Sequence, residues 1–363
     1  GYNLNIPRYV DSAEPTEQWD IFATIHGGIP KAELAQFADY WAAFDGLQTA
    51  LFTDNGTPYV QPKTDNLKAA MQSHASVLNY QAQFAQNFAD FTASLETLLI
   101  EPMETLNISQ TQQQLAELIR EKVQAMPLLD FYTAYQKLDD LWRADVAGIA
   151  ADLEMIQTEG KQVIKQVDPF MVLKKDSKTK KEAEVQDGWV GHILPFELVQ
   201  AVKLPQELAN LKAKKTRLAE IAAEMQSILE NLSEEEKACP AVNEEGDGFI
   251  NAEIPKALQQ ELESDGVAIA KKADLTKAID KHTFAEESLG AKLQTAYKLL
   301  AEEKTLKAEL KTQSAELHSK TKATIEALDD AEALDLLRQK WFVPLNAAMC
   351  KLPENMLAQF SQK

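Results

Sequence analysis

Cysteine and histidine are scarce, and none is placed for a metal site or a nucleophile. The chain has only two cysteines, Cys239 and Cys350, with no Cys-x-x-Cys partner and no histidine at metal-ligand spacing. None of the five histidines forms a His-x-x-x-His pair or lies in a recognisable Ser or Cys nucleophile motif. We interpret both cysteines as reduced thiols. The lack of a nucleophile, metal or phosphate motif also argues against an intact enzyme of unknown type.

Long apolar runs are also missing. The longest are interrupted by charges and fall well short of the roughly 20 residues that span a bilayer. No charged segment followed by an apolar one opens the chain. We therefore expect neither membrane insertion nor export, and we predict a cytoplasmic protein. Hydrophobic residues make up 45% of the 363 positions, which is enough to form the cores of two or three domains.

Positive charge is sparse, since 37 Lys and Arg face 56 Asp and Glu, a net charge of −19. DNA affinity comes mainly from Lys and Arg that neutralise phosphates, so any DNA contact must be local. The densest basic stretch is "KKDSKTKK", which contains Lys174, Lys175, Lys178, Lys180 and Lys181. We favour a solvated hairpin tip; the alternative is a contact to DNA phosphates, which carries little sequence information.

Loops for a methyltransferase cofactor are absent too. An amino-methyltransferase that uses S-adenosylmethionine needs a Gly-rich turn after a strand, and an Asn or Asp with two prolines and an aromatic residue for the flipped base. The Gly-x-Gly at residues 246–248 follows Glu244 and Glu245, which repel phosphate. Asp168 to Phe170 has one proline too few, and we predict a turn there. We therefore assign no catalytic or cofactor-binding residue and no cofactor to this chain.

An acidic turn at residues 243–254, "NEEGDGFINAEI", resembles an EF-hand calcium loop over most of its length. Gly248 falls at the sharp turn, and Glu245 and Asp247 at ligand positions. The last position, which needs a bidentate Glu, holds Ile254. We therefore expect no metal site, and we interpret the segment as an acidic turn between helices.

Helical periodicity dominates residues 31–160, which we predict to be a helical domain. A helix start at Pro30 is followed by patterns over 65–100, 109–126 and 130–157. The aromatic run "LLDFYTAYQKLDDLW" is predicted to be core rather than a binding platform. Residues 161–203 contain β-branched and aromatic residues broken by Gly and Pro, and predict a small β hairpin in a connector.

Apolar spacing near that of a coiled coil returns in residues 204–330. The predicted seam consists of Leu208, Leu211, Leu218, Ile221, Met225, Leu293, Leu300 and Leu310. We predict a long antiparallel coiled-coil hairpin with an irregular insert at 233–285, and a further helical segment at 331–363. The predicted fold class is therefore mainly α. The seam is structural, but the sides of such a hairpin suit docking to another helical subunit.

Several segments together resemble one protein family. They are "NLNIPRYVD", "HGGIPKAELAQFADYW", "MPLLDFYTAYQKLDDLWRADV", "GWVGHILPFELV", "DGVAIAKKADLTKAI" and "EALDLLRQKWFVPLNAAM". The first resembles the end of the methyltransferase domain in the modification subunits of type I restriction-modification systems. The others are similar to the extended C-terminal region of the longer members. We therefore expect residues 1–30 to be the exit from a missing methyltransferase domain and a linker.

The resemblance implies a parent that methylates adenine N6 in DNA with S-adenosylmethionine. It also implies a complex with a specificity subunit, a second modification subunit, a nuclease and translocase subunit, and DNA. In this family the C-terminal helices pack beside the helical spacer of the specificity subunit, a role expected here for residues 204–363. The alternative is a free-standing coiled-coil scaffold or interaction protein with no preference for such a subunit.

Overall fold

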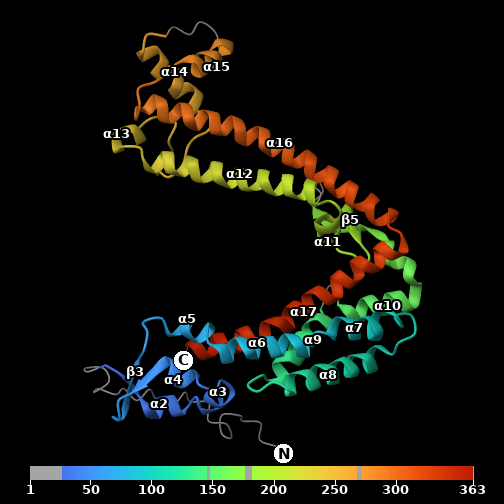
Figure 1. Cartoon of the computed structure of the whole chain (residues 1–363). Helices are drawn as coiled ribbons and strands as arrows, with labels where there is room; N and C mark the ends of the chain where they lie inside the picture. The colour runs from blue at the N-terminus through green and yellow to red at the C-terminus, as the bar shows by residue number, and fades with distance from the viewer. Residues whose placement is uncertain (1–26, 145–147, 176–181, 268–271, 363) are drawn as a thin grey trace, which may run out of the picture. The chain divides into compact units, whose positions relative to one another are not determined.

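The computed structural model describes residues 27–144, 148–175, 182–267 and 272–362, and these are mainly α-helical, as the sequence predicts (Figure 1). The chain divides into two compact units. Unit 1 comprises Gly1–Lys161 and Leu337–Lys363, and unit 2 comprises Gln162–Leu336. Most of the exit segment predicted for residues 1–30 lies outside the described residues.

Unit 1 combines short helices with a small antiparallel sheet of strand order β1-β3-β2. The strands are β1 (Ile29–Pro30), β2 (Phe52–Asp54) and β3 (Tyr59–Pro62). The helices are α2 (Lys31–Ala35), α3 (Ala38–Ala43), α4 (Leu47–Leu51), α5 (Leu67–Gln72), α6 (Ala75–Asn87), α7 (Phe91–Leu95), the π-helix η2 (Glu96–Ile100), α8 (Ile108–Gln124), α9 (Phe131–Trp142) and α10 (Ile149–Glu159). The sequence did not predict this sheet, because strands of two to four residues are too short to show alternation.

Polar caps divide the helix that we predicted over residues 65–100. The side chains of Asn66 and His74 each accept a hydrogen bond from a backbone N–H two or three residues further on, so α5 and α6 begin there. Asp90 precedes α7, which continues into η2. A single periodic pattern therefore corresponds to four consecutive helical elements.

Two other predicted helices are also broken. Pro30 ends β1 and precedes α2 instead of opening a longer helix, and Phe37, with φ −100° and ψ 23°, separates α2 from α3. The helix predicted over 130–157 is divided into α9 and α10. Gly148 precedes α10 where a Cβ atom would approach the carbonyl oxygen of Trp142 at 2.8 Å, so this turn requires glycine.

The core of unit 1 is completed by the C-terminal helix α17 (Asp330–Gln362). Its residues Met356, Leu357 and Phe360 pack in one cluster with Phe44, Leu47 and Phe84. Phe360 stacks on Tyr40, with ring centroids 4.2 Å apart. Residues 27–161 therefore lack part of their core without the end of the chain.

Two ion pairs attach α17 within unit 1. Arg338 donates to both carboxylate oxygens of Glu96 in η2, at 2.8 and 2.6 Å, and these hydrogen bonds lower the pKa of Glu96. Asp152 of α10 is fully buried and accepts from Lys340 Nζ at 2.5 Å and from Trp341 Nε1 at 2.7 Å. Burial lowers the pKa of Lys340, while Asp152 opposes that shift.

Unit 2 contains a two-stranded ribbon and a pair of long helices (Figure 1). Its elements are the 3₁₀ helix η3 (Lys161–Lys165), β4 (Val167–Lys175), β5 (Glu182–Gly191), α11 (Phe196–Lys203), α12 (Pro205–Glu230), α13 (Glu234–Lys237), α14 (Ile254–Ser264), α15 (Lys272–Lys281), α16 (Leu289–Ala327) and the start of α17. Helices α12 and α16 lie side by side, with α14 and α15 at one end of the pair and α11 and β5 at the other.

Candidate interaction site

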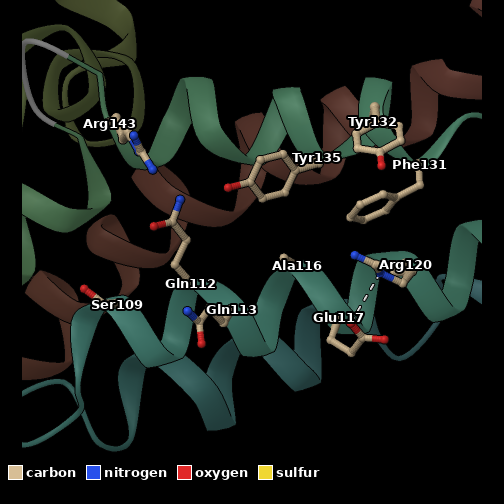
Figure 2. Close-up of a pocket in the computed structure, with 10 residues that line it drawn as sticks. All are labelled: Ser109, Gln112, Gln113, Ala116, Glu117, Arg120, Phe131, Tyr132, Tyr135 and Arg143. Atoms are coloured by element: carbon tan, nitrogen blue, oxygen red, sulfur yellow. Dashed lines mark ion pairs between the residues drawn. The ribbon is translucent and has the colours of Figure 1, made fainter. Parts of the chain in front are cut away.

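A groove between α8 and α9 has a volume of about 620 Å³ (Figure 2). Arg120 lies over the ring of Phe131, 4.3 Å from its centroid, and Tyr132 is 77% exposed. The exposed Tyr132 departs from the prediction that this aromatic run is core, although Leu138 and Trp142 of the same run are buried. Helix α9 thus turns one aromatic face outward.

Carboxylates accompany both arginines of this groove. Arg120 pairs with Glu117 at 3.3 Å, and Arg143 pairs with Asp139 at 2.9 Å (Figure 2 draws the first pair). Gln112 also donates to Asp139 at 2.9 Å. Because the positive charges are already matched, the groove lacks the excess charge that an anionic ligand would require.

The pair α12–α16 joins the predicted seam residues into two apolar regions. Near the ribbon, Leu208, Leu211 and Leu310 pack with Leu204 and Leu317. At the other end, Met225, Leu293 and Leu300 pack against the insert that contains α14 and α15. Of the two remaining seam residues, Ile221 is 1% exposed and Leu218 is half-buried. The helices run antiparallel, and supercoiling of the pair stays a prediction.

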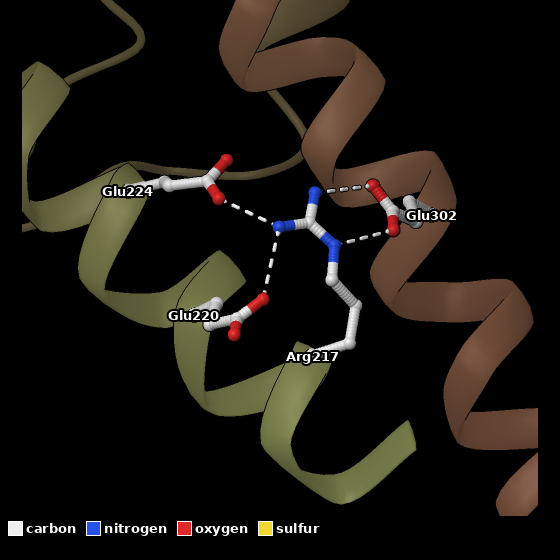
Figure 3. Close-up of polar contacts among 4 residues, drawn as sticks. All are labelled: Arg217, Glu220, Glu224 and Glu302. Carbon is white, nitrogen blue, oxygen red and sulfur yellow. Dashed lines mark hydrogen bonds and ion pairs between the residues drawn. The ribbon is translucent and has the colours of Figure 1, made fainter. Parts of the chain in front are cut away.

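Charged contacts fix the register between the two helices. Arg217 of α12 donates from Nε and Nη2 to the carboxylate of Glu302 on α16, at 2.7 and 2.9 Å (Figure 3). Its Nη1 also donates to Glu224 at 2.6 Å. Further pairs join Lys214 to Glu309 and Lys320 to Glu207. A bidentate ion pair allows little sliding of one helix along the other. The register of α12 and α16 is therefore defined by Arg217 and Glu302 as well as by the leucine contacts.

Electrostatics at Arg217 follow from the same contacts. The hydrogen bonds that Arg217 donates to Glu302, and then to Glu224, raise the pKa of Arg217, and the bond from Arg217 lowers the pKa of Glu302. Glu220 is a third carboxylate, 3.5 Å from Nη1. The cluster therefore carries more negative than positive charge.

The outer sides of the helix pair are polar. None of the exposed large hydrophobic side chains in the described residues lies on α12 or α16. A partner that docks along these helices would therefore meet charged and polar groups, and electrostatic complementarity would decide which partner is accepted.

Contacts to α16 fix the base of the β4–β5 ribbon. The backbone N–H of Trp189 donates to His318 Nε2 at 2.9 Å, and Lys322 Nζ lies 4.5 Å from a Trp189 ring centroid. Gly188 has φ +121°, and a Cβ atom there would approach His318 Nε2 at 2.8 Å. A Cβ on Gly191 would overlap the carbonyl oxygen of Leu194. These close approaches explain the glycines of the "GWVG" segment.

The predicted β hairpin is therefore present as β4 and β5, which pair antiparallel from Val167–Gly191 to Lys175–Glu182 with an irregularity between Pro169 and Met171. The turn predicted at Asp168 to Phe170 is wrong, because these residues lie within β4. Of the candidate DNA-contacting lysines, Lys178, Lys180 and Lys181 lie outside the described residues. Lys174 and Lys175 end β4, and Lys174 Nζ lies 2.6 Å from Asp187. A DNA contact by this stretch stays a prediction.

The acidic turn at residues 243–254 is organised by its own side chains. Asn243 Oδ1 accepts from the backbone N–H groups of Asp247 and Gly248, at 3.0 and 3.1 Å, and Asn243 Nδ2 donates to Asp247 Oδ1 at 2.7 Å. Ile254, which stands at the required glutamate position, is buried at the start of α14. The oxygens of Asn243 and Asp247 thus serve the turn itself. The expected absence of calcium binding stays a prediction.

No protein-family model, curated protein or solved structure matches the chain. The resemblance to type I modification subunits therefore rests on the sequence segments quoted above. In the described part of the chain, no helix combines the length and apolarity that crossing a membrane requires.

Proposed function

We propose that this chain is the noncatalytic C-terminal region of a type I restriction-modification methyltransferase subunit, and that it serves assembly with the specificity subunit in the cytoplasm. The parent would methylate adenine N6 in DNA with S-adenosylmethionine bound outside this region. The complex would also contain a second modification subunit, the nuclease and translocase subunit, and DNA.

The observation that carries the proposal is the pair α12–α16. These helices contain 26 and 39 residues, about 40 and 60 Å at the rise of an α-helix. Arg217–Glu302 and the leucine clusters fix their register, so the pair can present a long rigid surface. A rigid helical surface suits docking beside another long helical element, because little conformational freedom is lost on binding.

Polar outer sides support a specific partner over general adhesion. A surface without exposed large hydrophobic groups binds through matched charges and hydrogen bonds, which discriminate between partners. In the assembled complex, other chains would supply most of the positive charge for DNA, since this chain carries −19. DNA clamping by the lysines at the ribbon tip is a secondary part of the proposal.

Binding of the specificity subunit to the immobilised 363-residue chain tests the proposal. We expect the specificity subunit to bind this chain saturably. It should not bind an immobilised, unrelated antiparallel helical-hairpin protein. Lys215→Glu, on an exposed position of α12, should weaken binding several-fold, whereas Lys68→Glu, on an exposed position of α5, should leave it unchanged. A chain that ignores the specificity subunit would favour the free-standing scaffold and overturn the proposal.

A further inference from the structure

The β4–β5 ribbon concentrates the exposed apolar surface of the molecule. Five of the nine exposed large hydrophobic side chains in the described residues belong to it, namely Phe170, Met171, Leu173, Val185 and Val190. Leu173 is 67% exposed and lies near the end of β4. Clustered apolar exposure of this kind marks a protein-interaction surface, whereas single exposed residues need no explanation.

The two edges of the ribbon differ in how they are protected. In the described residues, the sheet contains only β4 and β5, so each strand has an outer edge that no third strand covers. On β5, the Trp189 N–H is already taken by His318. On β4, Pro169 removes one N–H donor, but the stretch Met171–Lys175 has no such protection. This stretch is the free edge of β4.

The positive charge on the free edge also protects less against pairing with another strand than the sequence implies. Lysine commonly guards an edge strand against pairing. Lys174, however, forms an ion pair with Asp187 across the ribbon at 2.6 Å, so its charge is matched within the same chain. The edge is therefore apolar at Met171 and Leu173, and the positive charge of Lys174 is compensated by Asp187.

We propose that the free edge of β4 pairs antiparallel with the same edge of a second copy of this chain. A two-fold axis through Leu173 brings the two Leu173 residues opposite each other and sets Lys174 opposite Val172 of the other copy, so the described lysines do not face one another. The product is a continuous four-stranded sheet with apolar side chains on both faces. Pairing through β5 is disfavoured, because the Trp189 N–H is already bonded to His318 and each copy would bring Glu184.

This self-association is independent of the specificity-subunit proposal, since it uses the ribbon and not the outer sides of α12 and α16. Two five-residue edges form a small interface. We therefore expect a weak dimer, with a dissociation constant of about 50 μM.

Sedimentation equilibrium of the whole chain from about 5 to about 300 μM tests the proposal. We expect a monomer–dimer equilibrium that Leu173→Lys abolishes. Leu78→Lys is the matched control, since Leu78 is 52% exposed on α6, and it should dimerise as the unchanged chain does. A chain that is monomeric over the whole range, or a dimer that Leu173→Lys leaves intact, overturns the proposal.

Disulfide trapping provides a second readout, because oxidation accumulates even a weakly populated dimer as a covalent product. In a Cys239→Ser, Cys350→Ser background, Leu173→Cys should form a covalent dimer on mild oxidation, because residues opposite each other in antiparallel strands lie within disulfide reach. Val185→Cys on β5 should cross-link at least tenfold more slowly. Equal cross-linking rates for the two variants would contradict pairing through the β4 edge. A monomer that instead binds a duplex DNA through Lys174 would assign the ribbon to nucleic acid and refute pairing between copies.

Discussion

At the scale of single residues, Asp152 connects α10 to α17 inside unit 1. Its carboxylate is fully buried, where an ionised group is stable only with a partner charge and hydrogen bonds. Lys340 supplies the charge, and both Lys340 and Trp341 donate hydrogen bonds to the same carboxylate oxygen, Oδ2. The position of α17 in unit 1 is therefore specified by a polar contact as well as by the aromatic cluster around Phe360.

Asp152→Asn should destabilise the chain by about 3–5 kcal/mol, because the buried charge of Lys340 would lose its ion pair with the Asp152 carboxylate. Urea unfolding followed by circular dichroism measures the loss. The double variant Asp152→Asn, Lys340→Met also removes the buried positive charge and should recover more than half of the lost stability. If single and double variants unfolded at the same urea concentration, the ion pair would not explain the attachment of α17.

At the scale of elements, the pair α12–α16 offers two seam positions with different burial. Ile221 is 1% exposed and Leu218 is half-buried, although the sequence pattern treated them alike. The same substitution at these two positions of one helix changes helix propensity in a similar way but removes different amounts of packing. The comparison therefore separates the two effects.

Ile221→Glu should open the helix pair, since it removes a transfer contribution of about 1.5–3 kcal/mol and buries an unpaired carboxylate. Leu218→Glu should have the smaller effect, because a half-buried side chain can turn its charge toward water. Limited proteolysis should then cut α12 and α16 while unit 1, with Trp41 and Trp142, stays resistant. Equal resistance of Ile221→Glu and the unchanged chain would contradict a packed seam.

The long elements could be predicted from the sequence, and the short ones could not. Apolar repeats sustained over many turns predicted α12 and α16, and β-branched residues around glycine predicted the ribbon. Strands β1 to β3 are too short to show a period, and caps such as Asn66 and His74 divide periodic segments without changing their apolar spacing.

Contacts between distant residues were equally hidden from sequence reasoning. Arg217 and Glu302 are 85 residues apart, and Asp152 and Lys340 are 188 apart. A sequence pattern gives the face on which a residue lies but not the residue opposite it. The exposed aromatic Tyr132 was missed for a related reason, since an aromatic run in a helix contributes to both its buried and its outward faces.

At the scale of the whole molecule, acidity and the two-unit organisation suit an assembly role. A net charge of −19 favours solubility and limits contact with DNA to places where other chains neutralise the phosphates. The end of α17 completes the core of unit 1, whereas the long pair, the insert and the ribbon belong to unit 2. This division gives unit 2 the surfaces for which we propose partners.

The central claim is that the specificity subunit docks along α12 and α16. Hydrogen exchange of the whole chain, with and without a saturating amount of that subunit, tests it most directly. Our account predicts slower exchange in Pro205–Glu230 and Leu289–Ala327, with unit 1 unchanged. Slower exchange confined to unit 1, or none in either helix, would contradict it.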